Sequence, residues 1–146
     1  MLVTTLDDVR EHLASAGTIA VLGAHVETWK PAFYVPDYLH RMGYRVLPVN
    51  PLFAGRTLFG ETVVASLAEL VAPVDMIDIF RRPEALPGHL DEIVAVVPRP
   101  RTIWLQLGIS HARFTATLVE RGYDVVEDRC TYADHRLFAL GPKSAA

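Results

Sequence analysis

The sequence has few of the residue types that build covalent or metal-based sites. Its single cysteine, Cys130, excludes a disulfide within the chain, and no Cys/His spacing resembles a zinc site. The longest apolar runs fall well short of the roughly 20 residues that cross a bilayer, and the start has no basic-then-apolar signal pattern. We therefore expect a cytoplasmic protein that binds neither a membrane nor a metal ion.

Positive charge is also scarce in this chain. Its 14 basic and 17 acidic side chains give a net charge of −3 at pH 7, whereas non-specific nucleic-acid binding requires a strongly basic surface. Nucleic acid is therefore not an expected partner. Hydrophobic residues make up 51% of the 146 residues and charged ones 21%, which excludes global disorder. We expect a single domain over residues 1–146, with its core at residues 5–138.

Apolar runs and helical stripes alternate along the chain. The expected strands are residues 18–22, 45–49, 74–80, 102–107 and 123–126. Helices are expected over residues 5–17, over 31–43, after Pro87, and from a cap at Ser110 to Gly122. The helix after Pro87 is expected to face the core with Leu90, Ile93, Val94 and Val97. Residues 51–62 suggest irregular structure or a short hairpin. We expect Ser66 and Glu69 to cap a brief helix. The tail after residue 126 has no strong pattern. The alternation predicts an α/β, Rossmann-like domain, in which helices cover both faces of a five-stranded, mainly parallel sheet.

The rarest polar residues follow the carboxyl ends of these expected strands. The only Asn, the only Gln, the only Cys and the only Lys outside the tail are Asn50, Gln106, Cys130 and Lys30. Carboxyl ends of parallel strands share one edge of a sheet, and open sheets bind their ligands there. The positions of these residues therefore predict a ligand site at that edge.

A phosphorylated ligand suits this edge, although the common nucleotide motifs are missing. Gly23 is the only glycine of its loop, and the second strand ends at Asn50 instead of an acidic residue, so the dinucleotide fingerprint is absent. A Walker A loop is absent too. Positive charge on the same edge comes from Lys30, Arg56, Arg81 and Arg82. Arginine pairs bidentately with phosphate, and Gly23 permits close approach of backbone to ligand.

Several short motifs occur in a distinctive order. They are Gly23 with Lys30-Pro31, VLPVNP at 46–51, RRPE at 81–84 after the strand at 74–80, WLQLG at 104–108 and DRC at 128–130. Over residues 5–138 the chain resembles the small stand-alone CoA-binding proteins of bacteria and archaea. More distantly, it is similar to the CoA-binding domain of succinyl-CoA synthetase. The resemblance implies that coenzyme A or an acyl-CoA lies across the strand edge. Its adenosine-phosphate part would be held by the loops after the first and second strands, and its pantetheine arm would pass the third and fourth strands.

The resemblance also implies which residues contact the cofactor. They are Gly23, Ala24, His25, Lys30, Pro31, Asn50, Pro51, Phe80, Arg81, Arg82, Gln106 and Gly108. The residues themselves leave structural alternatives open, because Asn50 also suits a turn and the amide of Gln106 needs a partner in either the ligand or the protein. Of the adjacent Arg81 and Arg82, we expect one to face the site. The catalytic histidine domain of the synthetase has no counterpart here, so ligase activity is not implied.

No nucleophile, base and orienting group come together in the sequence, so we expect a non-catalytic binding or sensing module rather than an enzyme. One alternative is a small acyl transferase that uses His25 or Cys130, and another is a nucleotide-binding redox module. A third is a regulatory protein that senses CoA and docks on another protein through exposed aromatic residues such as Trp29, Phe33 and Phe53. A homo-oligomer is also among the expected assemblies. Cys130 is expected to be buried and inert, since a mixed disulfide with CoA would require exposure and a pKa lowered by a neighbour such as Arg129.

Overall fold

The computed structural model, which describes residues 1–144, has a five-stranded parallel sheet at its centre. The strands are β1 (Thr18–Leu22), β2 (Arg45–Val49), β5 (Met76–Ile79), β6 (Thr102–Leu105) and β7 (Asp124–Val126). They are arranged in the order β2-β1-β5-β6-β7, and every neighbouring pair is parallel. The predicted α/β, Rossmann-like fold is confirmed.

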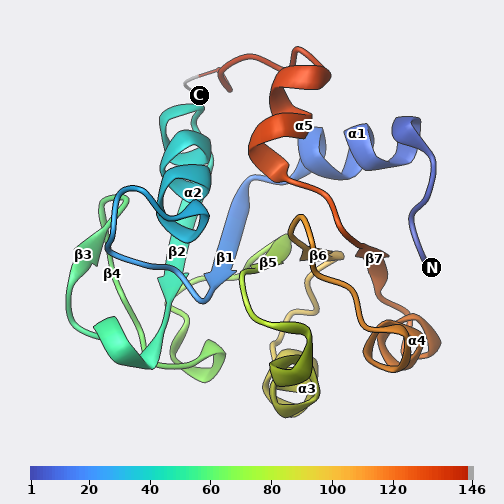
Figure 1. Cartoon of the computed structure of the whole chain (residues 1–146). Helices are drawn as coiled ribbons and strands as arrows, with labels where there is room; N and C mark the ends of the chain where they lie inside the picture. The colour runs from blue at the N-terminus through green and yellow to red at the C-terminus, as the bar shows by residue number, and fades with distance from the viewer. Residues whose placement is uncertain (145–146) are drawn as a thin grey trace.

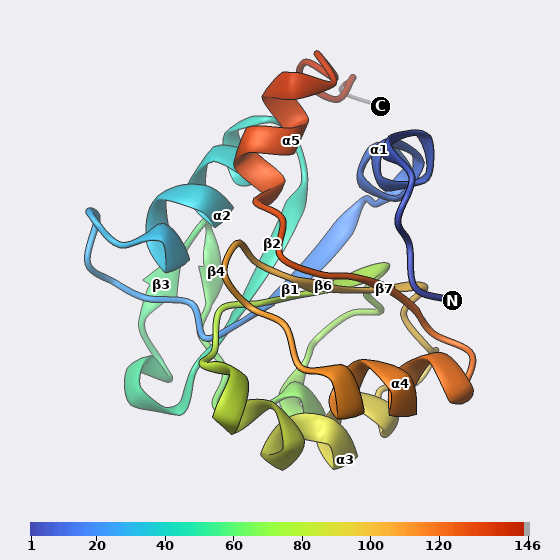
Figure 2. The same cartoon turned by 45° about the vertical axis from the view of Figure 1, so that its right-hand side comes forward.

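Helices cover both faces of the sheet, as predicted (Figures 1 and 2). On one face lie α1 (Leu6–Ser15), α2 (Pro31–Arg41) and α5 (Thr131–Leu137), and on the other lie α3 (Leu90–Val94) and α4 (Ala112–Glu120). Successive strand residues point to opposite faces, so the apolar strands supply two cores. Val21, Met76 and Trp104 belong to the core that α1 and α2 cover, whereas Ile77 and Ile103 belong to the core beneath α3 and α4. Among the helices of residues 1–144, none has the length and apolar character needed to cross a membrane.

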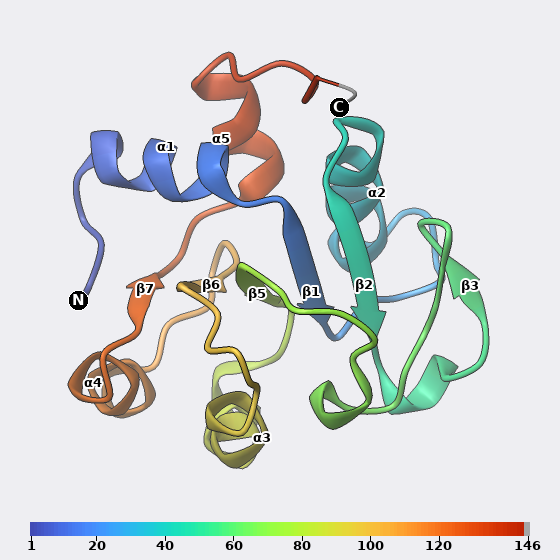
Figure 3. The same ribbon diagram turned by 180° about the vertical axis from the view of Figure 1, so that it is seen from behind.

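Both edges of the sheet are covered by other backbone segments. Beside β2 lies the antiparallel hairpin of β3 (Thr57–Leu58) and β4 (Glu61–Thr62), as Figure 3 shows from behind. Val64, just after this hairpin, donates its N–H to Pro48 at 3.1 Å and accepts from the N–H of Asn50 at 2.9 Å. At the opposite edge, the N–H of Val3 donates to the carbonyl of Val125 at 2.8 Å.

Short 3₁₀ segments account for much of the remaining chain. They are η1 (Pro51–Phe53), η2 (Leu67–Glu69) and η3 (Pro83–His89). At η2 the carboxylate of Glu69 accepts from the N–H groups of Ala65 and Ser66 at 3.0 and 3.1 Å. The predicted cap is therefore present, but the segment that it begins is a single 3₁₀ turn.

Some local predictions are wrong. Val97, predicted to face the core, is 86% exposed because α3 ends at Val94. The cap of α4 is His111 rather than Ser110, since the His111 Nδ1 accepts from the N–H of Phe114 at 3.0 Å. The tail without a pattern forms α5. Its buried residues are Thr131, Asp134 and His135, so no apolar stripe marks it.

The strand order creates a crevice at one edge of the sheet. From β1 the chain crosses to β2 on one side, and from β2 it crosses back to β5 on the other side of β1. The connections after β1 and β5 therefore diverge, and the carboxyl ends of these two strands lie at the topological switch point, where open α/β sheets bind ligands.

Candidate functional site

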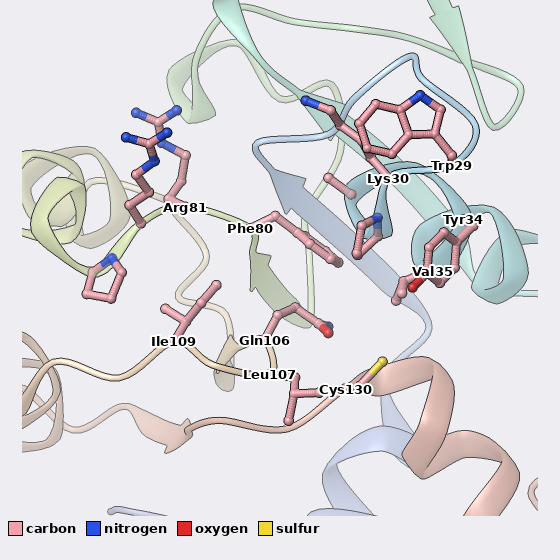
Figure 4. A pocket seen from close by; sticks show the side chains of 14 residues that line it. Trp29, Lys30, Tyr34, Val35, Phe80, Arg81, Gln106, Leu107, Ile109 and Cys130 are labelled. Atoms are coloured by element: carbon pink, nitrogen blue, oxygen red, sulfur yellow. The ribbon is translucent and has the colours of Figure 1, made fainter.

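A cavity of about 700 Å³ opens at this switch point, and its size is typical of a small-molecule site. The segment that follows β1 and begins α2 supplies residues 29–32, 34 and 35, and the segment after β5 supplies 80–83. Residues 106, 107 and 109 follow β6, and Cys130 precedes α5. Figure 4 shows these side chains around the cavity. The predicted ligand site at the carboxyl edge of the sheet therefore coincides with a real cavity, which we call the edge pocket.

Positive charge is concentrated at one end of the edge pocket. Lys30 and Arg81 lie at that end, and Leu107 and Cys130 lie at the other (Figure 4). The Lys30 ammonium is 5.3 Å from the centroid of the Trp29 ring, and the Arg81 Nε donates to His89 Nε2 at 3.2 Å. Arg82 also lines the pocket, although we expected only one of the two adjacent arginines there. The lining thus combines a cationic end with an uncharged end.

The predicted cofactor-binding residues divide into two groups. Those that line the edge pocket are Lys30, Pro31, Phe80, Arg81, Arg82 and Gln106. Those outside its lining are Gly23, Ala24, His25, Asn50, Pro51 and Gly108. The sequence reasoning did not assign the apolar lining residues Tyr34, Val35 and Ile109 to the site. Tyr34 and Val35 belong to the first turns of α2, and a helical apolar pattern does not distinguish a pocket wall from a core.

Two residues outside the lining have clear structural roles. Gly23 has φ +94°, and a Cβ there would lie 2.4 Å from the carbonyl oxygen of Phe80. Asn50 is buried, its Nδ2 donates to the carbonyl of Ala24 at 2.9 Å, and its Oδ1 accepts from the N–H of Leu52 at 2.9 Å. Gly23 therefore lets the loops after β1 and β5 approach each other, and Asn50 ties the loop after β2 to the loop after β1.

Replacing Asn50 by alanine is expected to lower the free energy of unfolding by about 1–3 kcal/mol, because it leaves the Ala24 carbonyl without its donor. Urea titration measures the loss. Asn50→Asp keeps an acceptor for Leu52, but it replaces the donor by a buried negative charge against the Ala24 carbonyl, so it should lose at least as much stability. Unchanged stability of Asn50→Ala, together with weakened ligand binding, would contradict the structural role and indicate a ligand contact instead.

His25 and Gly108 are held by local contacts. The Nδ1 of His25 accepts from the N–H of Glu27 at 3.0 Å, and its ring meets that of Phe53 edge to face at 4.7 Å between centroids. The N–H of Gly108 donates to Asp128 Oδ1 at 2.6 Å. These contacts shape the loops after β1 and β6, next to the residues that line the pocket.

Cys130 faces the edge pocket but is not an activated thiol. It is partly buried, and desolvation raises the pKa of the Cys130 thiol above its ordinary value. The guanidinium of Arg129, a candidate for lowering that pKa, instead binds the Asp134 carboxylate through Nε and a terminal nitrogen at 2.6 and 2.7 Å. The thiol form therefore predominates at neutral pH, and the condition that we set for a mixed disulfide is not met.

A buried polar cluster that the sequence did not reveal lies behind the pocket wall. Asp78 of β5 is fully buried, and its two carboxylate oxygens accept from Gln106 Nε2 at 2.7 and 2.9 Å. The Thr131 hydroxyl accepts from the same Nε2 at 2.8 Å and donates to Asp78 at 3.2 Å. Desolvation raises the pKa of Asp78 to about 7, against the opposing effect of both hydrogen bonds. We call Asp78, Gln106 and Thr131 the buried cluster.

The comparisons with known proteins agree with this geometry. A solved structure from Thermus thermophilus, named cell-free ID.343, is 51% identical, covers 92% of this chain and 98% of its own, and superimposes with a TM-score of 0.87. A hypothetical protein from Pyrococcus horikoshii OT3 is 24% identical with a TM-score of 0.85 over 93% of both chains, which shows the shared fold. The uncharacterized protein YneT of Bacillus subtilis is 30% identical over 128 residues, or 88% of this chain and 92% of YneT.

A family model described as a CoA binding domain matches residues 17–136. This range includes the whole five-stranded sheet and every segment that lines the edge pocket. The chain therefore belongs to the CoA-binding domain family.

Proposed function

We propose that the protein binds coenzyme A or an acyl-CoA in the edge pocket, as a non-catalytic binding or sensing module. The observation that carries this proposal is the separation of charge along the pocket, with Lys30 and Arg81 at one end and an uncharged lining at the other, while Arg82 adds a further positive charge to the lining. Coenzyme A has the matching polarity, since its phosphates lie on the nucleotide part and its thiol ends a long uncharged pantetheine arm. Membership of the CoA-binding domain family supports the same ligand class.

The polarity gives the ligand an orientation. Phosphate groups belong near the two arginines and Lys30, because guanidinium groups form bidentate, charge-assisted hydrogen bonds with phosphate. The pantetheine arm then passes Phe80 and Gln106 toward Cys130. Trp29 is 70% exposed beside the cationic end, so its ring is available to stack on a base.

The candidate catalytic side chains support a binding role rather than acyl transfer. His25 accepts a backbone hydrogen bond through Nδ1, and the pKa of Cys130 is raised, so the geometry activates neither side chain. A nucleotide-binding redox module would need a dinucleotide site, and the glycine fingerprint of such a site is absent from the loop after β1.

Titration of the protein with CoA tests the proposal, with tryptophan fluorescence as the readout. Trp104 is fully buried in the core, whereas Trp29 is exposed at the pocket, so ligand binding is expected to change the Trp29 emission. Calorimetry with CoA, dephospho-CoA, NAD and ATP then ranks the ligands, and we expect CoA to bind most tightly. Equal binding of the four ligands, or no binding of any, would contradict the proposal.

Removing both pocket arginines, as Arg81→Ala with Arg82→Ala, is expected to weaken CoA binding by roughly 10- to 100-fold, since hydrogen bonds to charged groups contribute about 1.5–3 kcal/mol before solvent screening. The loss is expected to shrink as salt is added. Arg10→Ala with Arg113→Ala is the matched control, because it removes the same charge from exposed positions on α1 and α4 outside the edge pocket. Equal effects of the two double variants would indicate only a general effect of net charge.

A further inference from the structure

The amide group of Gln106 is fixed in one orientation by the buried cluster. Its Nε2 donates to both carboxylate oxygens of Asp78 and to the Thr131 hydroxyl. A carboxylate only accepts hydrogen bonds, so a reversed amide would place Gln106 Oε1 against the Asp78 oxygens within about 3 Å. Above the pKa of about 7, the ionised carboxylate of Asp78 therefore decides which atom of the amide faces away from the cluster.

The atom that faces away is the carbonyl oxygen Oε1. Gln106 is 4% exposed and lines the edge pocket, and Figure 4 shows its amide end between Phe80 and Cys130. Among residues 1–144, no donor is hydrogen-bonded to this oxygen, whereas both hydrogens of Nε2 have acceptors. Within residues 1–144, this oxygen is not one of the fully buried polar atoms that lack a partner, so it is accessible from the pocket and available to a donor of the molecule that fills it.

We propose that Gln106 is a specificity-determining residue that accepts a hydrogen bond from the ligand at the uncharged end of the edge pocket. The donor is an amide N–H or the thiol S–H of a pantetheine arm, and Asp78 and Thr131 act as positioning residues for Gln106. A ligand that presents an acceptor at this point, such as the carbonyl of a thioester, is disfavoured. The inference rests on the proposed function, because the direction of the arm follows from the placement of the phosphates.

The test compares CoA with acetyl-CoA in the unmodified protein and in variants of the buried cluster. Asp78→Asn has nearly the same shape but offers one acceptor and one donor, so it no longer holds the amide of Gln106 in a single orientation. A triple variant, Asp78→Val with Gln106→Leu and Thr131→Val, removes the whole buried cluster, so no member of it is left buried without a partner. Ser110→Ala, at an exposed position outside the pocket lining, is the control. Circular dichroism verifies the fold of each variant.

The two possible donors give different results. If the thiol is the donor, the unmodified protein prefers CoA over acetyl-CoA by roughly three- to tenfold, and both cluster variants lose this preference. If a pantetheine amide is the donor, CoA and acetyl-CoA bind alike, and the cluster variants weaken both by a similar factor. Folded variants with unchanged affinity for both ligands would overturn the inference while leaving the proposed function intact. Absence of CoA binding by the unmodified protein would instead refute the proposed function, and this inference with it.

Discussion

Gly23→Ala is expected to lower the free energy of unfolding by about 2–5 kcal/mol. At φ +94° any residue with a Cβ is strained, which costs roughly 1–2 kcal/mol. The new methyl group would also lie 2.4 Å from the carbonyl oxygen of Phe80, so the loops after β1 and β5 must separate, at a cost of roughly 1–3 kcal/mol for overpacking. Urea denaturation, followed by circular dichroism, measures the loss.

Two other glycines separate these contributions. Gly108 has φ +83° with nothing near its missing Cβ, so Gly108→Ala is expected to cost only the backbone strain. Gly88 has neither a positive φ nor a close neighbour, so Gly88→Ala should be neutral or slightly stabilising. Equal losses at Gly23 and Gly108 would show that contact with Phe80 adds nothing. Because the same loops line the edge pocket, Gly23→Ala should weaken CoA binding as well.

The second large effect is a pH dependence caused by Asp78. An unperturbed aspartate, as in the unfolded chain, has a pKa of 3.8, whereas the pKa of Asp78 rises to about 7 in the folded protein because burial disfavours the charged form. Between these two values the unfolded chain holds fewer protons than the native one, so the free energy of unfolding falls as the pH rises. From pH 5 to pH 9 this carboxyl group is expected to reduce stability by about 3 kcal/mol, with little further change above that range.

Asp78→Asn isolates this contribution, because the asparagine does not titrate. Burial lowers the pKa of His12 and of His135, so these histidines make the protein more stable as the pH rises through their ordinary range, which is the opposite sign. Their contribution is common to both proteins and cancels in the difference. Urea titrations at pH 5, 7 and 9 measure this difference. From pH 5 to pH 9, the free energy of unfolding of Asp78→Asn should rise by about 3 kcal/mol relative to that of the unmodified protein. A difference independent of pH would mean that Asp78 titrates normally.

The strands were largely predictable because local residues determine them. The expected limits of β1 and β2 match the structure, since each strand is a nearly uninterrupted apolar run that ends at Gly23 or Asn50. The fold class followed from the alternation of such runs with helical stripes. Helix α5 could not be predicted in this way, because polar side chains occupy its buried face and find their partners in tertiary contacts. His135, for example, is hydrogen-bonded to the Tyr38 hydroxyl at 2.8 Å.

The candidate site was predictable at the level of the sheet edge but not of single contacts. The position of Lys30, Arg81 and Gln106 after successive strands was enough to place them at one pocket. The partners of Gln106 lie on β5 and at the start of α5, 28 and 25 residues away in the chain, and no sequence spacing predicts that the three meet. For Asn50 the structure supports the capping role that the sequence left open beside ligand contact.

The covered edges of the central sheet restrict how this protein can assemble with others. Beside β2, the backbone of Val64 is hydrogen-bonded to the carbonyl of Pro48 and to the N–H of Asn50. Beside β7, the N–H of Val3 is hydrogen-bonded to the carbonyl of Val125. A partner that adds a strand to a sheet needs unpaired backbone groups along an edge, and neither outer strand offers an open row of them. We therefore expect a homo-oligomer or a regulatory complex to form through surfaces other than the edges of the central sheet, such as the helices or the pocket mouth. A ligand that fills the pocket would alter that second surface directly, and with it the affinity for any protein that docks there.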